Sequence, residues 1–369
     1  MNSCPVCIMN DSIKEFKMTK TNICNFCAEW EKQKHLYTNF TQNKISQNLS
    51  NIKKKIIDSK NNKKYDCVIG LSGGTDSSFV VYHAWKLGLN PIIIHMDNGW
   101  NSKISNHNIN KILDRTSFDY KTLILDWEEF KDLQISFLKA GVPDIELITD
   151  HAIFAYIIDF AVKENIKFIL SGVNFATEHS TINSWGWRKD DFNHIKKIHK
   201  IFGKHELKTF PKMYPFKRFY YENIKKKINV INLLDFINYN SSEAKEILKK
   251  EFNWENYGGK HRESFFTMFF QGYILPEKFK IDKRILHLSC MIRNKEITRD
   301  KALEIIALPP LESQNINQYV NFFKKKLQLS NDEFVKIMSE KPKRHSDYDI
   351  DIYNNWVFQL IKKAVKKLL

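Results

Sequence analysis

The sequence predicts an α/β protein built on a doubly wound parallel sheet, with a small cysteine-rich module before the sheet and a mostly helical region after it. Three observations predict this class: strand-like and helix-like segments alternate from Tyr65 onward, four of the six cysteines lie near the N-terminus, and strand signals fade beyond about residue 235. Helices between strands imply crossover connections and therefore parallel strands. A chain of 369 residues has room for several units, and we expect three, with the bounds 1–45, 46–235 and 236–369.

The first unit is defined by two Cys-x-x-Cys pairs separated by sixteen residues, formed by Cys4, Cys7, Cys24 and Cys27. Two knuckles at this spacing can supply four thiolates to one tetrahedral Zn²⁺. The segment has little apolar periodicity, so it needs such a link to fold. We therefore predict a structural zinc site, with an iron–sulfur cluster or a disulfide pair as alternatives. Cys67 and Cys290 are predicted core residues.

The second unit alternates two kinds of segment. The predicted strands are 65–71, 91–96, 120–125 and 167–170, and the predicted helices are 77–87, 130–138 and 150–163. The Lys- and Asn-rich stretch from Asn43 to Lys64 is expected to be a linker with some helix. In the third unit, the clearest helical segments are 241–252 and 353–369.

A glycine-rich loop follows the first predicted strand and opens the first predicted helix. Adjacent glycines let a ligand approach the backbone, N–H groups at a helix start attract anions, and serine hydroxyls add donors. A carboxylate repels phosphate, so Asp76 is assigned to Mg²⁺ or to orienting the loop. An ordinary Ser/Gly turn is the alternative. The residues expected to hold a pyrophosphate group are Ser72, Gly73, Gly74, Thr75, Asp76, Ser77 and Ser78.

The segment Ser72-Gly73-Gly74-Thr75-Asp76-Ser77 resembles the signature of the PP-loop ATP pyrophosphatases, which have an adenine nucleotide alpha hydrolase-like fold. The resemblance implies that ATP adenylates a substrate oxygen, with loss of pyrophosphate, before a nucleophile displaces AMP. It also implies that the end of the second strand, at Met96 and Asp97, contacts adenosine. The loop after the fourth strand, with Gly172 and Asn174, would face ATP.

Further motifs narrow the resemblance. They are the Cys-x-x-Cys-x-Met knuckle, Gly-x-Asn-x-Ala-Thr-Glu at 172–178, Tyr-Gly-Gly-Lys-His-x-Glu-Ser at 257–264, and Lys-Phe-x-Ile-Asp-Lys-Arg at 278–284. Together they look like the N-acetyl sugar amidotransferases. That family is associated with lipopolysaccharide and other bacterial surface glycans, including the pseudaminic acid pathway and flagellin glycosylation. Membership implies that ATP activates the oxygen of an acetamido group and that ammonia replaces it, giving an acetamidino group.

The same resemblance implies roles for individual residues. Asp76, Glu178, Lys260 and His261 would be catalytic, with Glu178 positioning Mg²⁺, the sugar or ammonia. Lys283 and Arg284, together with Lys278, would be cations for ATP phosphates or for an acidic sugar, although solvated basic residues are the alternative for this segment.

Asp150 is expected to cap the helix that follows it. The run Trp185-Gly186-Trp187-Arg188 either stacks on a ligand or packs between domains.

The sequence shows no domain that could release ammonia from glutamine, so we expect a partner protein to supply it. Glutamine hydrolysis needs a nucleophilic cysteine with a histidine partner, and no such domain is evident. The resemblance implies that ammonia comes from a separate glutaminase of the imidazole-glycerol-phosphate synthase type. The other partner would be a sugar or nucleotide-sugar substrate. No apolar run approaches the ~20 residues of a membrane span and no secretory signal is visible, so we expect a cytoplasmic protein without membrane contact.

The net charge of +16 leaves a second function open. The lysines are scattered along the chain, which favours a generally solvated surface over a nucleic-acid site, although an anionic substrate or RNA remains possible on charge alone. The rival interpretation is a PP-loop tRNA-modifying enzyme that thiolates or amidates a base. A zinc-knuckle binding module with an inactive nucleotide fold is the alternative from another class.

Overall fold

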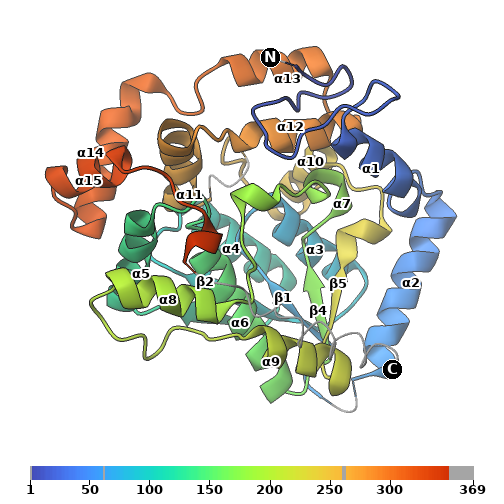
Figure 1. Cartoon of the computed structure of the whole chain (residues 1–369). Helices are drawn as coiled ribbons and strands as arrows, with labels where there is room; N and C mark the ends of the chain where they lie inside the picture. Colours follow the sequence, from blue (N-terminus) through green and yellow to red (C-terminus); the bar gives the residue numbers. More distant parts are fainter. Residues whose placement is uncertain (1, 61–62, 260–262, 349–369) are drawn as a thin grey trace.

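The computed structural model describes residues 2–60, 63–259 and 263–348 and contains one five-stranded sheet (Figure 1). The predicted terminal helix at 353–369 and the predicted catalytic Lys260 and His261 lie outside these ranges. The strands are β1 (Cys67–Gly70), β2 (Ile92–Asp97), β3 (Tyr120–Ile124), β4 (Phe168–Ser171) and β5 (Asn229–Asn232). All neighbours are parallel and the order is β3-β2-β1-β4-β5. The predicted doubly wound parallel sheet is therefore confirmed.

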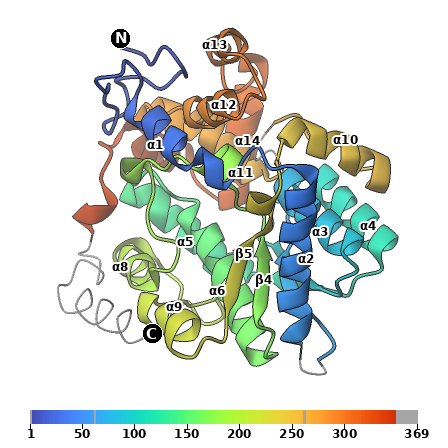
Figure 2. The ribbon, with the colours of Figure 1, turned by 90° about the vertical axis from the view of Figure 1, so that its right-hand side faces the viewer.

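Side chains that alternate along β1 explain why both faces of the sheet are covered. Cys67 and Ile69 point into one apolar cluster, and Val68 points into another on the opposite face. The first cluster is completed by helices α2 (Gln42–Asp58), α3 (Thr75–Lys86), α4 (Lys103–Thr116) and α10 (Ser241–Phe252), and the second by α6 (Leu147–Lys163). Figure 2 shows these helices on the two sides of β4 and β5.

Fifteen α-helices lie in the described part of the chain. Those around the sheet are α2 (Gln42–Asp58), α3 (Thr75–Lys86), α4 (Lys103–Thr116), α5 (Trp127–Ala140), α6 (Leu147–Lys163), α7 (Phe175–Glu178), α8 (Phe192–Phe202), α9 (Pro215–Phe219) and α10 (Ser241–Phe252). The others are α1 (Asn25–Gln33), α11 (Phe265–Phe269), α12 (Lys283–Arg293), α13 (Arg299–Ala307), α14 (Ile316–Leu327) and α15 (Asn331–Ser339).

Several elements differ from the sequence prediction. The expected linker before the sheet contains the 17-residue helix α2, whose Ile52 and Ile56 pack into the core. Helix α4 and strand β5 were not predicted, because α4 is rich in Asn and Lys and β5 has only four residues, two of them Asn. The prediction that Asp150 caps its helix is wrong: α6 begins at Leu147, so Asp150 lies inside the first turn.

The cysteine-rich segment lies against the C-terminal helices rather than apart from them. In Figure 1 the N-terminal chain runs beside α12 and α13. The backbone N–H of Ile8 donates to Ser289 Oγ at 3.3 Å, and Arg299 Nε donates to the Cys7 carbonyl at 3.2 Å. Contacts of this kind link segments almost three hundred residues apart, and the division of the chain into three units stays a prediction. Within the described ranges, no helix combines the length and the apolar character needed to cross a bilayer.

Helix α14 supplies a test of how the C-terminal helices are held. Phe323 is fully buried and lies 4.7 Å from the ring of Phe269, whereas its neighbour Phe322 is 45% exposed. We expect Phe323→Ala to lower the free energy of unfolding by about 3–5 kcal/mol, since it leaves a large cavity. Phe322→Ala is the matched control and should cost much less. Urea denaturation of both variants makes the comparison, and equal losses would contradict the described packing of α14.

Candidate functional site

The glycine-rich loop has a backbone that only glycine suits. Gly73 has φ +80°, and a Cβ there would lie 2.6 Å from the carbonyl oxygen of Ser105. Ser105 Oγ in turn donates to the Ser72 carbonyl at 2.8 Å, and Trp254 Nε1 donates to the Gly73 carbonyl at 3.0 Å. The loop is therefore held from α4 and from the segment after α10.

The serines of the loop have different positions. Ser72 and Ser77 lie with their hydroxyls 3.1 Å apart, and Ser72 Oγ accepts the N–H of Gly74 at 3.2 Å. Both hydroxyls are at the loop surface or partly buried, as the prediction for a pyrophosphate cradle requires. Ser78 is fully buried and points into the interior, so its predicted contact with a ligand would need a change of conformation.

A cavity of about 660 Å³ opens beside the loop. The first two loops that border it come from β1 and β4, at the point where the strand order reverses, and ligands in open parallel sheets bind at such switch points. The predicted site residues among its lining residues are Thr75, Asp76, Glu178, Lys283 and Arg284. Residues that the sequence did not single out also line it, among them Ser180, Lys245, Gln271 and His287.

Two tyrosines fix the loop and were not assigned a role from the sequence. Tyr239 Oη donates to Asp76 Oδ1, and Tyr257 Oη accepts the N–H of Thr75 at 3.0 Å. Burial, with the nearby Asp76 carboxylate, holds the pKa of Tyr239 well above its usual value, so its proton stays in place. Tyr257 lies within a motif that supported the family resemblance, whereas nothing in the sequence around Tyr239 signals its contact with the loop.

The loop after β4 positions one acidic residue at the cavity. Gly172 packs so closely on the start of α3 that a Cβ would lie 3.1 Å from the backbone N of Ser77. Asn174 is buried and caps α7, accepting the N–H of Thr177 at 2.9 Å. Its amide is thus engaged inside the loop, and Glu178, at the end of α7, is the acidic residue of this segment that lines the cavity. A role for Gly172 and Asn174 through backbone or side-chain contact with ATP stays a prediction.

The end of β2 does not border this cavity. Met96 packs against the apolar core, and Asp97 Oδ1 accepts the N–H of Gly99 at 2.8 Å. The turn is covered by Lys326 of α14, whose ammonium lies 4.6 Å from the Trp100 ring centre. The predicted contact of Met96 and Asp97 with adenosine stays a prediction, and the cavity residues alone do not provide it.

The predicted cations are held by protein partners. Lys283 Nζ lies 3.0 Å from Glu146 Oε2, which also accepts Gln271 Nε2 at 2.8 Å. Burial lowers the pKa of Lys283, but Glu146 and Asp144 outweigh it, so the pKa is raised and the ammonium stays charged. Arg284 donates to Asp282 and to carbonyls at the end of α13, and all its donor nitrogens are engaged. A phosphate contact by Arg284 would have to replace these bonds.

Other candidate binding residues pack away from the cavity. Lys278 is 8% exposed, donates to the Ile337 carbonyl of α15 and is not among the residues that line the cavity, so its predicted contact with a phosphate stays a prediction. The Trp187 ring stacks on His345 at 5.4 Å, and its backbone N–H donates to Asp144 Oδ2 at 3.0 Å. The Trp187 ring packs within the protein, and a contact of the run 185–188 with a ligand stays a prediction.

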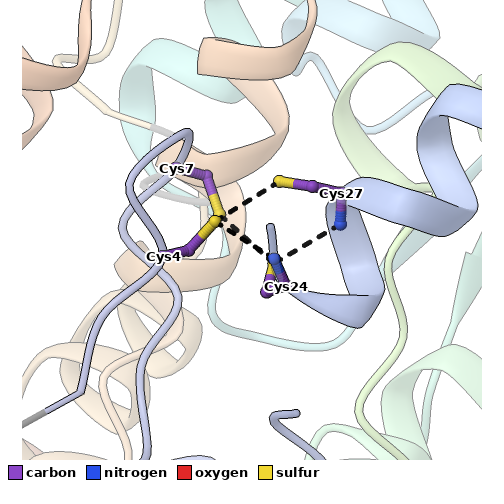
Figure 3. A group of neighbouring side chains, drawn as sticks. All are labelled: Cys4, Cys7, Cys24 and Cys27. Atoms are coloured by element: carbon purple, nitrogen blue, oxygen red, sulfur yellow. Dashed lines mark hydrogen bonds between the residues drawn. The ribbon is translucent and has the colours of Figure 1, made fainter. Parts of the chain in front are cut away.

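The four N-terminal cysteines converge in a metal-binding arrangement. Figure 3 shows Cys4 and Cys7 from the N-terminal loop facing Cys24 and Cys27 at the start of α1. All four are buried, and their sulfur atoms lie within 4.8 Å of one another. Sulfurs 2.3 Å from a tetrahedral Zn²⁺ are separated by about 3.8 Å. The measured Cys4–Cys27 and Cys7–Cys24 separations are 3.9 and 3.7 Å. The donor set and spacing thus fit one metal ion, and the iron–sulfur cluster stays an alternative prediction.

The sheet order and the loop at its carboxyl edge define the class of the protein, a doubly wound α/β protein with a candidate anion site at the switch point. Residues 263–364 match the family described as LPS biosynthesis protein WbpG-like, C-terminal domain. This segment includes α11, α12 and α13, which form the wall of the cavity opposite the loop. No curated protein matches the chain.

Three solved structures with weak similarity are NMN synthetase from Francisella tularensis, NAD+ synthetase from Burkholderia pseudomallei and the U34-tRNA thiolase NcsA from Methanococcus maripaludis with its 4Fe-4S cluster. Identities are 13, 14 and 14%, and TM-scores 0.30, 0.32 and 0.34. The matches cover 61, 62 and 77% of this chain and 97, 99 and 86% of the others. Similarity at this level carries no argument about function.

The conformation of Gly73 leads to a first prediction for the site. Gly73→Ala should lower the free energy of unfolding by about 1–2 kcal/mol or more, because an L-residue is strained at positive φ and the Cβ meets Ser105. Gly186→Ala is the control, since Gly186 has φ −138° and a Cβ there would meet only Asp144 Oδ2, at 3.5 Å. Chemical denaturation compares the two. A Gly73→Ala variant as stable as the control would show that the loop has another conformation.

Burial of His151 leads to a second prediction. His151 is fully buried, its Nδ1 lies 2.7 Å from the Lys189 carbonyl and its Nε2 accepts the Met213 N–H. Burial lowers the pKa of His151 from 6.5 to about 4. The neutral form is therefore favoured by folding, and this stability is complete above pH 6.5 and lost as the pH falls toward 4. Between pH 7 and 5 the loss should be about 2 kcal/mol from this residue.

The measurement is urea denaturation at both pH values for His151→Gln, which keeps a donor and an acceptor but does not titrate. Its stability should fall less between pH 7 and 5 than that of the unmodified chain. The exposed His205 provides the matched control, His205→Gln. If His151→Gln and the unmodified chain lose the same stability, the buried neutral imidazole is not a determinant of acid sensitivity.

Proposed function

We propose that the chain is an ATP-dependent amidotransferase that converts an acetamido group of a bacterial surface-glycan sugar into an acetamidino group, releasing AMP and pyrophosphate. The observation that carries the proposal is the shared cavity. One wall is the glycine-rich loop at the switch point of the sheet, and the other is formed by helices of the segment that matches an LPS biosynthesis domain. The site thus joins a glycine-rich loop, which would bind phosphate, to a segment associated by its description with LPS biosynthesis.

The loop would hold the phosphates of ATP. The N–H groups of Gly74 and Thr75 at the start of α3 are the donors best placed for phosphate oxygens, and they are occupied here by Ser72 Oγ and Tyr257 Oη. A phosphate oxygen would compete with these two hydroxyls for the same N–H groups. Lys283 and Lys245 line the same cavity and would add positive charge. ATP contacts by the predicted residues Lys260 and His261 remain part of the proposal.

Two carboxylates from different strand ends would bind the metal that accompanies ATP. Asp76, after β1, and Glu178, after β4, both line the cavity, and carboxylate oxygens are the ligands that Mg²⁺ prefers. Bound Mg²⁺ would neutralise charge on the phosphates during transfer. Tyr239, by donating to Asp76 Oδ1, orients that carboxylate.

The chemistry requires activation because an amide oxygen is a poor leaving group. Attack of the acetamido oxygen on the α-phosphorus of ATP forms a P–O bond and releases pyrophosphate. Ammonia then adds to the imidate carbon, the C–O bond breaks, and AMP leaves with the oxygen. The protein's part is to position the sugar and to stabilise charge that develops at phosphorus. The helices opposite the loop offer an apolar wall, with Ile305 and Leu311 among its residues, on which a sugar can be held out of water.

Ammonia would come from a separate glutaminase of the imidazole-glycerol-phosphate synthase type. All six cysteines of the chain lie in its described part and each is buried. Cys67 lies within β1, where burial raises the pKa of its thiol, and Cys290 lies within α12. These positions do not suit a cysteine that must attack glutamine. The four N-terminal cysteines would instead hold a structural Zn²⁺.

The proposal is tested with purified protein, ATP, Mg²⁺ and ammonium. N-acetylated nucleotide sugars and free N-acetylated acidic sugars are compared with bulk tRNA, and AMP, pyrophosphate and product mass are measured. We expect AMP only with a sugar, together with a product in which NH replaces O. Formation of AMP only with tRNA would favour the PP-loop tRNA-modifying alternative. No AMP with any acceptor would overturn the proposal.

Substitution of the proposed metal ligand gives a further prediction. Asp76→Asn should lower the rate of AMP formation about 100-fold or more, because charge on the phosphates would lose its stabilisation. Glu246→Gln is the control, since Glu246 is an exposed carboxylate of α10 that does not line the cavity. Steady-state AMP release measures both. Full activity of Asp76→Asn would remove Asp76 from the proposed machinery.

A further inference from the structure

Helix α12 contacts both the cavity and the cysteine cluster. Lys283 and His287 line the cavity, and Arg293, at the other end of the helix, lies against the cysteines. The Arg293 guanidinium is 4% exposed. Its Nη1 donates to Cys7 Sγ at 3.9 Å and to Cys27 Sγ at 3.7 Å, and its Nη2 donates to Ser180 Oγ at 2.8 Å.

The charge of Arg293 needs a partner that the carboxylates do not provide. Within residues 2–60, 63–259 and 263–348, its partners are sulfur and hydroxyl groups, and its Nε is buried without a hydrogen-bond acceptor. An unpaired buried guanidinium is strongly destabilising. Neutral thiols would leave that charge uncompensated, whereas thiolates around a metal would balance it.

The balance also works in the opposite direction. Four thiolates around a divalent ion carry two excess negative charges in a buried site, which is unfavourable without a nearby cation. Arg293 is placed to reduce this charge through two of the four sulfurs. Arg299 also contacts the cysteine module, but it donates to the carbonyls of Cys7 and Cys4 rather than to sulfur. Arg293 therefore contacts the sulfur atoms of the cysteine cluster, whereas Arg299 contacts its backbone.

Ser180 connects this cluster to the cavity. It follows α7, is 6% exposed, and is one of the residues that line the cavity. The same loop is held to the cysteine module a second time, because Glu15 accepts the N–H and the hydroxyl of Ser184 at 2.8 and 2.9 Å. Arg293 therefore connects the sulfur cluster to Ser180 by hydrogen bonds, and Ser180 and Glu178 line the same cavity.

We propose that Arg293 is a positioning residue that stabilises a metal-bound form of the cysteine cluster and, through Ser180, ties metal occupancy to the shape of the cavity. The proposal rests on the metal site proposed above. Residues that hydrogen-bond to metal ligands commonly contribute 10–100-fold to metal affinity. The metal would then affect the cavity as well as stabilise the fold of the N-terminal segment.

Metal retention is the first test. Full-length protein is loaded with Zn²⁺, and transfer of the ion to a chromophoric chelator is followed for the unmodified chain, Arg293→Met, Arg293→Lys and Arg299→Met. We expect Arg293→Met to release Zn²⁺ about tenfold faster or more, Arg293→Lys to lie between it and the unmodified chain, and Arg299→Met to change the rate much less. Equal rates for Arg293→Met and the unmodified chain would overturn the proposal. Failure of the unmodified chain to hold Zn²⁺ would instead overturn the metal site.

Coupling to the cavity is tested with Co²⁺ in place of Zn²⁺, because sulfur-to-cobalt absorption bands report on the thiolates directly. ATP with Mg²⁺ is added to the cobalt protein and to its Ser180→Ala variant, which keeps the guanidinium on the sulfurs. We expect ATP to shift the bands of the unmodified chain and not those of Ser180→Ala. ATP binding to each protein is first measured by equilibrium dialysis. With ATP bound, the same shift in both proteins, or none in either, would overturn the coupling, whereas no ATP binding would overturn the proposed function. Neither result depends on turnover, so the assigned reaction is tested separately.

Discussion

The reversal of strand order beside β1 is the constraint on which the site depends. The chain builds β2 and β3 on one side of β1 and then crosses over to place β4 and β5 on the other. The loops that leave the carboxyl ends of β1 and β4 therefore lie beside each other at the switch point, where open parallel sheets bind ligands. Asp76 and Glu178 reach the same cavity although about a hundred residues separate them, because each follows a strand that ends at this edge. The strand order therefore determines that Asp76 and Glu178 lie near each other.

Local patterns were sufficient to predict the central part of the fold. Apolar runs predicted β1, β2, β3 and β4, and a helix over 241–252 coincides with α10. The Cys-x-x-Cys spacing predicted a cluster whose sulfurs do converge. Strand β5 escaped detection because a four-residue edge strand with exposed residues has no distinct pattern, and its pairing with β4 exists only once the sheet is formed. Asp150 was expected to cap its helix because Asp is a favoured N-cap residue. The apolar residues before it extend the helix by one turn, and this extension depends on packing rather than on capping preference.

The cavity could be predicted only in part, for a physical reason. Residues at strand ends are located by the sheet, so Thr75, Asp76 and Glu178 follow from sequence. The opposite wall is made by helices whose placement depends on long-range contacts, and Lys245, Gln271 and Ser180 become neighbours of the loop only in three dimensions. In the same region, positive charge in the sequence was not sufficient to predict which basic residues can face a ligand. Lys278 and Arg284 looked equivalent to Lys283 in the sequence, but the first is buried against α15 and the second is committed to Asp282 and α13. Lys283 lines the cavity and is paired with Glu146.

Helix α12 has eleven residues and presents Lys283 to the cavity and Arg293 to the cysteines. Successive residues of an α-helix are rotated by about 100° around its axis. A single-residue insertion or deletion between the two ends would therefore turn one set of side chains away from its target while leaving the helix itself intact. Substitutions on the outer face of α12 carry no such penalty. The length of this helix, more than the identity of most of its residues, is what variation among related chains must preserve if both sites are to be kept in one molecule.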